Sequence, residues 1–420
     1  MKQGPGGVTA PKGFQAAGVH CGVKRGKGDG NQPPMSRMPE VLDSKKDLAL
    51  IVSEQPCVAA AVYTMNRVKA APLYVTMDHL ENGEAQGIVA NSGNANACAP
   101  NSHEHAERMC QLAAAATGLK PGDFVVASTG VIGQELNIAA IEKGMPEAAR
   151  ALSRDGSDAA ANAIMTTDTV KKEMSVTCAI GGKTVTIGAI AKGSGMIHPN
   201  MGTMLCFVTT DCAVTHELLS EALHEIIPRT FNRVTVDGDT STNDMCVVLA
   251  NGMAGNPLIE WKDDGYTVFL KALRQLCQEL ARAIAGDGEG ASRLITCAVR
   301  EARSEESAER LAKAVVGSPL VKAAMFGTDA NWGRVLCAMG YSKAPFRPEY
   351  VDISFSSAVG AVAVCRGGMG LDFDEEAARS ILSQDEVVID VHLHEGEHEA
   401  TCWGCDLTYE YVKINGDYRI

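Results

Sequence analysis

Two runs of strand-forming residues flank a glycine-rich loop near the middle of the chain. Residues 183–191 read KTVTIGAIA, and the apolar run MLCFV begins directly after Thr203. The segment between them, KGSGMIHPNMG at residues 192–202, is rich in glycine and contains a proline. Apolar and β-branched runs bounded by such residues are typical of buried strands. The sequence therefore predicts two strands and a loop that ends in a Gly-Thr pair.

The Gly202–Thr203 pair has the residue types that backbone self-cleavage requires. Gly202 lacks a Cβ atom, so the peptide before Thr203 can adopt a geometry that most residues forbid. The Thr203 hydroxyl can then attack the Gly202 carbonyl, and water can cut the resulting ester. Cleavage gives Thr203 a free α-amine, which titrates near about pH 8 and can serve as base for its own hydroxyl. The alternative is that Gly-Thr merely begins a strand.

The wider block KGSGMIHPNMGTML resembles the self-processing segment of the ornithine acetyltransferases, the bifunctional glutamate N-acetyltransferases of arginine biosynthesis. The similarity covers nearly the whole chain, from GVTAPKGF close to the start to WGCDLTYEYVKIN close to the end. In that family the nucleophilic threonine follows a small residue, usually alanine, where this chain has Gly202. The resemblance implies cleavage between Gly202 and Thr203, with Thr203 as the nucleophile.

A second motif, DFVVASTGVIG at residues 123–133, reads as a strand that runs into a loop. By its match to the family, Thr129 and Gly130 supply the oxyanion hole. A threonine hydroxyl and an unobstructed glycine N–H are suitable donors to the negative charge of a tetrahedral acyl intermediate. From composition alone, a β-turn with threonine as its cap is the alternative.

Three further residues match substrate-binding positions of the family. Lys192 lies between an apolar run and a glycine loop, with no acidic residue within four positions. A lysine there suits the α-carboxylate of an amino acid, and a solvated surface lysine is the alternative. Glu289 is flanked by glycines in GDGEGAS, and its carboxylate suits the ammonium group of ornithine or glutamate. Thr169, in the segment TTDT, matches a substrate contact by position.

The C-terminal segment ATCWGCDLTYEYVKINGDYRI completes the family positions. We expect a pair of strands that carries Asn415, which matches a substrate-binding asparagine. Members of the family end in a serine or threonine that also contacts the substrate, whereas this chain ends in Ile420. Because Ile420 has no hydroxyl, only its main chain or terminal carboxylate can make that contact.

Charge and composition argue against several classes of partner. A net charge of −13, without a cluster of lysine and arginine, argues against nucleic acid. No apolar run is long enough to span a bilayer, and the first residues lack the apolar core of a signal peptide. The fourteen cysteines are scattered singly apart from Cys402 and Cys405, so we expect reduced thiols in a cytoplasmic protein.

We expect neither a metal nor a bound cofactor. The Cys402–Cys405 pair lacks two further zinc ligands at similar spacing. The acidic loop at residues 237–244 lacks the final glutamate of a calcium loop, and in the family it lies near the active site without metal. The turn NSGNAN lacks the spacing of a dinucleotide site. The resemblance leaves open whether acetyl-CoA is a co-substrate.

Strands flanked by helices indicate an α/β fold, and the resemblance implies stacked β-sheets between helical layers, as in a self-processed enzyme of the N-terminal-nucleophile kind. It further implies two chains, residues 1–202 and 203–420, intertwined in one compact unit and paired again as α2β2. The expected reaction is ping-pong transfer of acetyl from N-acetylornithine to glutamate through acetyl-Thr203. Two alternatives stay open: a self-processed amidase or aminopeptidase, and a non-enzymatic amino-acid-binding protein.

Overall fold

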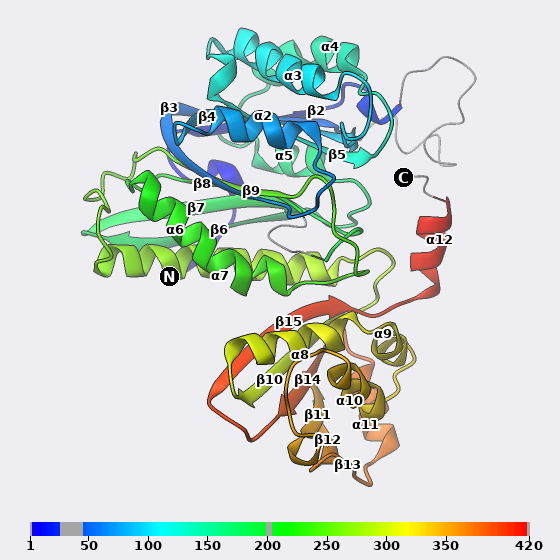
Figure 1. Cartoon of the computed structure of the whole chain (residues 1–420). Helices are drawn as coiled ribbons and strands as arrows, with labels where there is room; N and C mark the ends of the chain where they lie inside the picture. The colour runs from blue at the N-terminus through cyan, green and yellow to red at the C-terminus, as the bar shows by residue number, and fades with distance from the viewer. Residues whose placement is uncertain (1, 26–44, 199–203, 418–420) are drawn as a thin grey trace.

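The computed structural model describes residues 2–25, 45–198 and 204–417, which form two β-sheets with helices packed against them (Figure 1). The larger sheet has nine strands among the described residues. They are β1 (Lys2–Gly4), β2 (Phe14–Val19), β3 (Leu48–Tyr63), β4 (Glu84–Asn94), β5 (Phe124–Val131), β6 (Lys172–Ile180), β7 (Lys183–Lys192), β8 (Leu205–Thr210) and β9 (Met245–Ala250). Both runs that flank the glycine loop are therefore strands, as the sequence predicts.

The long strand β3 joins the two halves of this sheet. The order is β1-β6-β7-β8-β9-β3-β4-β5, with β2 paired to β3 outside this path. The first part of β3 pairs with β4 and its last part, from Val58 to Tyr63, pairs with β9. The register with β4 shifts between Val52 and Cys57, and such an irregularity bends a strand. One buried cluster contains Ile51 and Phe207, one from each half, so the two halves pack face to face.

Helices cover the outer faces of the two halves, and α5 packs in the layer between them. Helices α3 and α4 lie over the β2–β5 half, and α6 and α7 lie over the β6–β9 half (Figure 1). This is the predicted stack of sheets between helical layers. The helices of this part are α2 (Ala71–His79), α3 (Ser102–Thr117), α4 (Ile138–Arg150), α5 (Ser157–Ile164), α6 (His216–Ile226) and α7 (Asp264–Gly286).

The second sheet has six strands among the described residues, in the order β13-β12-β11-β14-β10-β15. Helices α8 to α11 pack on it around a separate apolar core. Trp403 and Cys405, at the end of β15, belong to the buried cluster of α6 and α7 and so connect the two sheets. The elements are β10 (Leu294–Ala302), α8 (Glu305–Gly317), α9 (Pro319–Phe326), α10 (Trp332–Gly340), β11 (Asp352–Ser357), β12 (Gly360–Arg366), β13 (Met369–Gly370), α11 (Glu375–Leu382), β14 (Glu386–His392) and β15 (His398–Cys405).

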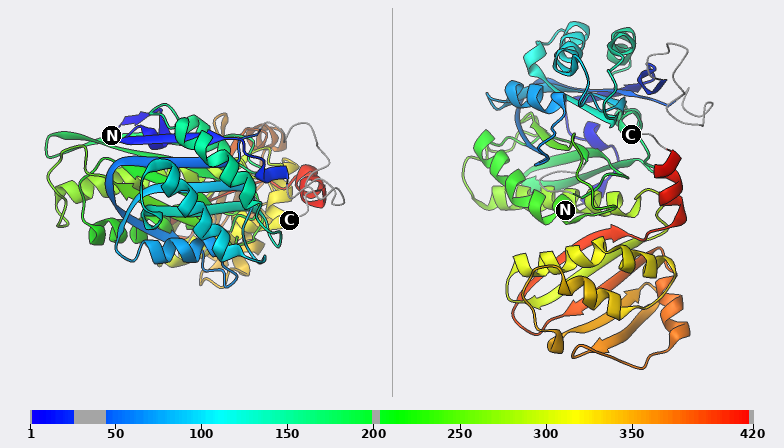
Figure 2. Two further views of the ribbon diagram at one scale, coloured as in Figure 1. Left: turned by 90° about the horizontal axis from the view of Figure 1, so that it is seen from above. Right: turned by 45° about the vertical axis from the view of Figure 1, so that its right-hand side comes forward.

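Strand ends from several segments meet at one edge of the larger sheet. Lys192 at the end of β7 is opposite Leu205 at the start of β8, and Leu205 is beside Met245 at the start of β9. The last helix, α12 (Tyr409–Asp417), follows β15 and returns beside this part of the molecule (Figure 2). The C-terminal helix therefore comes close to strand ends from the middle of the sequence.

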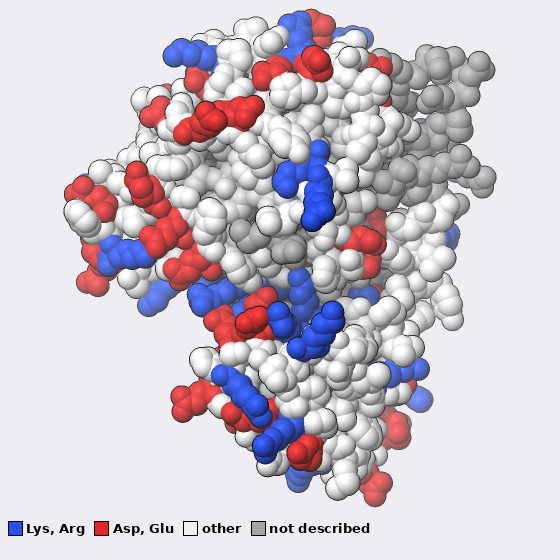
Figure 3. Space-filling view, in the orientation of Figure 1, with Lys and Arg blue, Asp and Glu red and all other residues white. Residues whose placement is uncertain are grey.

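The surface shows no segregation of charge on the face drawn in Figure 3, where basic and acidic side chains are interspersed. Among the described residues, no helix has the length and apolar character needed to cross a membrane. The fourteen cysteines, all of them in the described part of the chain, are free thiols.

Candidate active site

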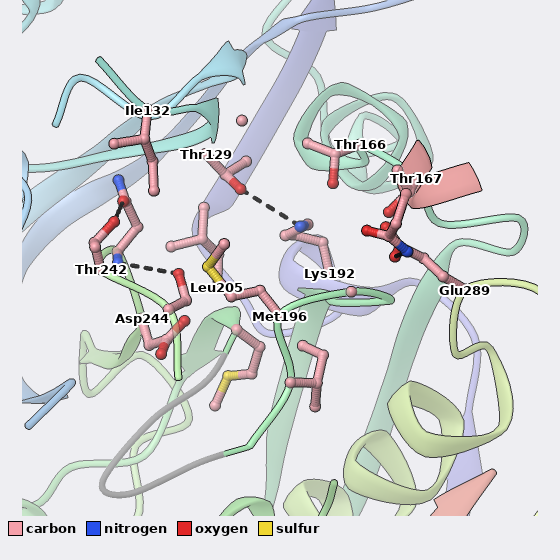
Figure 4. Close-up of a pocket in the computed structure, with 17 residues that line it drawn as sticks. Thr129, Ile132, Thr166, Thr167, Lys192, Met196, Leu205, Thr242, Asp244 and Glu289 are labelled. Atoms are coloured by element: carbon pink, nitrogen blue, oxygen red, sulfur yellow. Dashed lines mark hydrogen bonds between the residues drawn. The ribbon is translucent and has the colours of Figure 1, made fainter. Parts of the chain in front are cut away.

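A pocket opens where the end of β7 meets the starts of β8 and β9 (Figure 4). It brings together five predicted site residues from distant segments: Thr129, Gly130, Lys192, Glu289 and Asn415. In Figure 4, Thr166, Thr167 and Glu289 lie on one side of Lys192, and Thr242 and Asp244 lie on the other. The remaining described residues of the wall are Ile132, Gly195, Met196, Ile197, Met204, Leu205, Ser241 and Asn243.

The two predicted oxyanion-hole residues end strand β5 at the pocket wall. Gly130 has φ +133°, a conformation that residues with a Cβ atom rarely adopt. A Cβ atom at this position would lie 2.3 Å from the Gly93 carbonyl carbon of the neighbouring strand β4. Glycine at position 130 therefore allows the two strands to approach, and it leaves the Gly130 backbone without a side chain of its own over it.

Lys192 belongs to a buried charge network with Asp168 and Lys172. The Lys192 ammonium group lies 4.0 Å from an Asp168 carboxylate oxygen and donates a 3.4 Å hydrogen bond to the Thr129 hydroxyl. The other Asp168 oxygen accepts hydrogen bonds of 2.7 Å from the Lys172 ammonium group and from the Gly193 N–H. Asp168 thus fixes the position of Lys192 at the bottom of the glycine loop.

Burial and the neighbouring charges both act on the pKa values of Asp168 and Lys192. Burial by itself would raise the pKa of Asp168, but the charges of Lys192 and Lys172 outweigh it and lower that pKa to about 2. Burial lowers the pKa of Lys192, while the charge of Asp168 opposes that shift. Asp168 is consequently ionised at neutral pH and holds the two lysines together.

Asp237 holds the glycine loop on its other side. Its two carboxylate oxygens accept hydrogen bonds from the N–H groups of Met196, at 2.7 Å, and Ile197, at 3.0 Å. The Thr240 hydroxyl donates a 2.7 Å hydrogen bond to the His198 carbonyl. These contacts attach the segment that precedes the Gly202–Thr203 pair to the acidic loop at residues 237–244.

Glu289 and Asn415 form the acidic side of the pocket. Glu289 is 8% exposed, and the Asn415 side-chain amide donates a 2.7 Å hydrogen bond to one of its carboxylate oxygens. The Glu289 N–H donates to the Ser194 carbonyl at 3.0 Å. A Cβ atom at Gly195 would lie 2.3 Å from the Glu289 carboxyl carbon, so the glycine loop allows this carboxylate to lie against its backbone.

Asn415 lies on a helix, so the predicted second C-terminal strand is wrong. Only β15 is a strand, and α12 follows it. The Thr408 hydroxyl accepts a 3.2 Å hydrogen bond from the Glu410 N–H where the helix begins. The Asn415 amide also donates to the Tyr411 carbonyl one helical turn earlier, at 3.1 Å. The β-branched and aromatic residues that favoured a strand include Tyr409 and Val412, which are exposed on this helix.

The acidic loop supplies four described residues of the pocket wall that the sequence did not assign to the site, namely Ser241, Thr242, Asn243 and Asp244. The Asn243 amide donates to the carbonyls of Ala95, at 2.6 Å, and Ser128, at 2.9 Å, and so ties this loop to the β4 and β5 segments. Asp244 is 3% exposed, and burial raises its pKa. One of its oxygens has no hydrogen-bond partner among the described residues. The many acidic and amide side chains in this loop were the sequence feature that could have indicated the site, but such a composition is also typical of a calcium-binding loop.

The structure does not bring all predicted site residues into the pocket wall. The Thr169 hydroxyl and N–H both donate to the Asp287 carboxylate, the N–H at 3.1 Å, and Thr169 is not among the described lining residues. Thr166 and Thr167 of the same TTDT segment do line the pocket. Gly202, Thr203 and Ile420 lie outside the described residues.

The described pocket presents different charges at separate positions. Lys192 supplies a cation, Glu289 supplies a carboxylate, and Thr129 has a hydroxyl group at the wall beside Gly130. Such a pocket can bind a small molecule that bears both a carboxylate and an ammonium group. Across the described residues, no group of three or more histidine, cysteine, aspartate or glutamate side chains is placed to hold a metal ion.

Comparison with known proteins identifies a family and several relatives. A family model described as the ArgJ family matches residues 37–420. The chain is 54% identical over 415 residues to the arginine biosynthesis bifunctional protein ArgJ of Symbiobacterium thermophilum, with 99% of this chain and 98% of that protein covered. It is 49% identical over 407 residues to the arginine biosynthesis bifunctional protein ArgJ 1 of Clostridium acetobutylicum, with 97% and 96% covered. A crystal structure of arginine biosynthesis bifunctional protein ArgJ from Bacillus halodurans, 46% identical, matches 50% of this chain and 98% of that chain with a TM-score of 0.49.

Proposed function

This chain belongs to the ArgJ family, and from that premise we propose that it transfers acetyl from N-acetylornithine to glutamate through an acetyl-Thr203 intermediate. The family membership confirms the resemblance to the ornithine acetyltransferases, and the chain is an acyltransferase of arginine biosynthesis. The ping-pong course, the nucleophile and the roles of the pocket residues are the proposed part.

One observation carries the proposal: residues on both sides of the Gly202–Thr203 bond line a single pocket with the predicted oxyanion and substrate residues. Ile197 precedes that bond and Met204 directly follows Thr203, and both line the pocket. Thr129, Gly130 and Lys192 complete the same wall. A nucleophile released at residue 203 would therefore begin a chain whose second residue is already at this wall.

In the first half-reaction, the Thr203 oxygen attacks the acetyl carbonyl of N-acetylornithine. The C–N bond breaks, ornithine leaves, and the Thr203 α-amine moves the proton from the hydroxyl to the leaving nitrogen. The Gly130 N–H and the Thr129 hydroxyl stabilise the tetrahedral oxyanion. Since Lys192 donates to the Thr129 oxygen, the hydroxyl proton remains available for the oxyanion. In the second half-reaction, the amine of glutamate takes the acetyl group by the reverse steps.

Substrate recognition follows from the charges of the wall. Lys192 binds the α-carboxylate, and the carboxylate of Glu289, oriented by Asn415, binds the side-chain ammonium group of ornithine. The contact predicted for the TTDT segment is assigned to Thr166 and Thr167, because these two residues line the pocket. We also propose that Ile420 contacts the substrate through its main chain or its terminal carboxylate.

We propose that cleavage gives chains of residues 1–202 and 203–420, which stay together in one unit. Strands β7 and β8 lie on opposite sides of the junction and pair along six residues from Ile187 to Lys192, so the sheet resists separation of the two chains. An α2β2 assembly in the cytoplasm, use of acetyl-CoA as a further acetyl donor, and catalysis without a metal or bound cofactor belong to the same proposal.

Two linked experiments test this function. On a denaturing gel the wild-type protein should give two bands, whereas Thr203→Ala should give one uncut band without transferase activity. N-acetylornithine should yield N-acetylglutamate only when glutamate is added. Hydrolysis of N-acetylornithine at the same rate without glutamate would support an amidase, and full transfer by Thr203→Ala would refute the nucleophile.

A further inference from the structure

A second cavity adjoins the catalytic pocket on the side of the TTDT segment. The two share Thr166 in their walls. Its described lining consists of Lys24, Lys45, Lys46, Asn162, Met165, Thr166 and Asp168. We call Lys24, Lys45, Lys46 and the space between them the lysine cavity. None of these lysines has a part in the proposed transfer mechanism.

The lysine cavity lies directly behind the oxyanion segment. A Cβ atom at Gly93 would lie 2.6 Å from the Lys24 Cγ atom, so the Lys24 side chain packs on the Gly93 backbone. Gly93 in turn packs against Gly130, where a Cβ atom would lie 2.3 Å from the Gly93 carbonyl carbon. One layer of backbone therefore separates Lys24 from a proposed catalytic residue.

The ammonium groups of Lys24 and Lys46 are directed to backbone carbonyls. Lys24 is 6% exposed, and its Nζ donates to the carbonyls of Lys46, at 2.9 Å, and Met165, at 3.1 Å. Lys46 Nζ donates to the Gly18 carbonyl at 2.9 Å. Burial lowers the pKa of Lys24 to about 8, the charge of the buried Asp47 opposes this shift, and the charge of Lys45 adds to it. Asp47 therefore offsets one of the three lysine charges, and the hydrogen bonds to neutral carbonyls do not cancel the others.

The acidic residue in the described lining, Asp168, is already engaged. It accepts from Lys172 at 2.7 Å and lies 4.0 Å from the Lys192 ammonium group. Lys172 is shared with Asp287 at 2.6 Å, so two lysines outside the lysine cavity face the two carboxylates of Asp168 and Asp287. The described cavity is cationic overall, and a small anion is the ligand class that it fits.

The two substrates of the proposed reaction explain why a second cationic region is useful. The side chain of ornithine ends in an ammonium group, whereas that of glutamate ends in a carboxylate. Glu289 attracts the first and repels the second. Among the described residues of the catalytic pocket, Lys192 is the single basic side chain, and it is assigned to the α-carboxylate. A reactant with a second anionic group, such as the side-chain carboxylate of glutamate, therefore needs a basic partner outside this pocket.

We propose that the lysine cavity binds an anionic group that N-acetylornithine lacks. Two reactants can carry such a group: glutamate, through its side-chain carboxylate, and a phosphate-bearing thioester donor such as acetyl-CoA, through a phosphate. This inference rests on the proposed function, because it assumes that the adjoining pocket holds those reactants. It assigns recognition of the cationic reactant to Glu289 and recognition of the anionic reactant to the lysine cavity.

The test removes two charges and compares the half-reactions. Lys45→Gln/Lys46→Gln removes both charges and keeps polar side chains that can donate hydrogen bonds. Lys24 stays because its buried ammonium group holds two carbonyls. The matched control, Lys120→Gln/Lys143→Gln, removes the same charge from two exposed lysines outside the cavity. The cavity variant should raise the KM for the anionic reactant by about tenfold. The rate of ornithine release from N-acetylornithine should stay unchanged, and it serves as the internal reference.

The result also identifies the anion. A rise in KM for glutamate alone assigns the cavity to its carboxylate, and a rise for acetyl-CoA alone assigns it to a phosphate. An unchanged KM for both reactants, an equal loss in the N-acetylornithine half-reaction, or the same changes in the control would overturn the proposal.

Binding of inorganic phosphate separates this inference from the proposed function, since it needs no turnover. Calorimetric titration should detect phosphate binding to the wild-type protein and to the Lys120→Gln/Lys143→Gln control, and about tenfold weaker binding to the cavity variant. Weaker binding to the variant supports the cavity even if the wild-type protein transfers no acetyl group. Equal binding to all three proteins would count against it.

Discussion

Replacement of Thr129 by valine is the sharpest probe of the proposed oxyanion hole. Valine has nearly the same shape as threonine and also suits the end of strand β5, so the change removes a hydroxyl with little effect on packing. Thr129 is 9% exposed, which means that water cannot easily replace the lost donor. The Gly130 N–H remains as the second donor.

The expected cost follows from the loss of one of two donors. Removal of a single oxyanion-hole donor typically costs about 3 kcal/mol of transition-state stabilisation, or about 10² to 10³ in kcat. We expect Thr129→Val to lower the kcat of acetyl transfer within that range and to change the KM for N-acetylornithine little. The Lys192 ammonium group loses its hydroxyl acceptor but keeps Asp168 at 4.0 Å.

The assay measures ornithine release and N-acetylglutamate formation, normalised to the cleaved fraction on a denaturing gel. This normalisation separates an effect on transfer from an effect on processing. Thr129→Ser, which keeps the hydroxyl, should recover most of the lost activity. If Thr129→Val loses less than about tenfold in normalised kcat, the hydroxyl does not stabilise the oxyanion and the reasoning is refuted.

Three further outcomes follow from the buried network and the oxyanion glycine. Asp168→Asn should lower the free energy of unfolding by about 3 kcal/mol in denaturant titration, because it leaves the buried Lys192 without its acidic partner, whereas Lys172 keeps Asp287 at 2.6 Å. Adding Lys192→Met should recover part of this loss, and no loss would contradict the network. Because the folded-state pKa of Asp168 is lowered from 3.8 to about 2, its stabilisation is fully present above pH 3.8 and is lost as the pH falls through about 2. The difference between wild type and Asp168→Asn should therefore shrink in acid, and a constant difference down to pH 2 would refute the assignment. Gly130→Ala should lower the melting temperature more than Gly133→Ala, since both have positive φ but only position 130 meets backbone within 4 Å; equal losses would argue against the close contact.

Sequence reasoning succeeded where a segment carries its own pattern. The KTVTIGAIA and MLCFV runs are β7 and β8, and the stack of sheets between helical layers follows the family resemblance. It failed for α12, which was expected to be the second strand of a pair. Two hydrogen bonds stabilise that helix, one from the Glu410 N–H to the Thr408 hydroxyl and one from the Asn415 amide to Glu289. Neither contact produces a periodic pattern in the sequence.

The partners of Lys192 show why the site could be predicted only in part. Its acidic partner, Asp168, lies 24 positions earlier in the sequence, and no acidic residue lies within four positions of Lys192. The pairing arises because the Gly193 N–H and the Thr166 N–H both donate to the same carboxylate, at 2.7 and 3.1 Å. Contacts of this kind depend on how strands meet, which residue types and spacing do not specify.

Direct detection of the acyl-enzyme tests the central claim. The protein is mixed with N-acetylornithine without glutamate, denatured at once, digested and analysed by peptide mass spectrometry. The account predicts a peptide that begins at Thr203 and carries one acetyl group, which hydroxylamine removes as an ester and glutamate converts to N-acetylglutamate. An unmodified Thr203 peptide in a sample that has released ornithine, or an acetyl group on another residue, would contradict it.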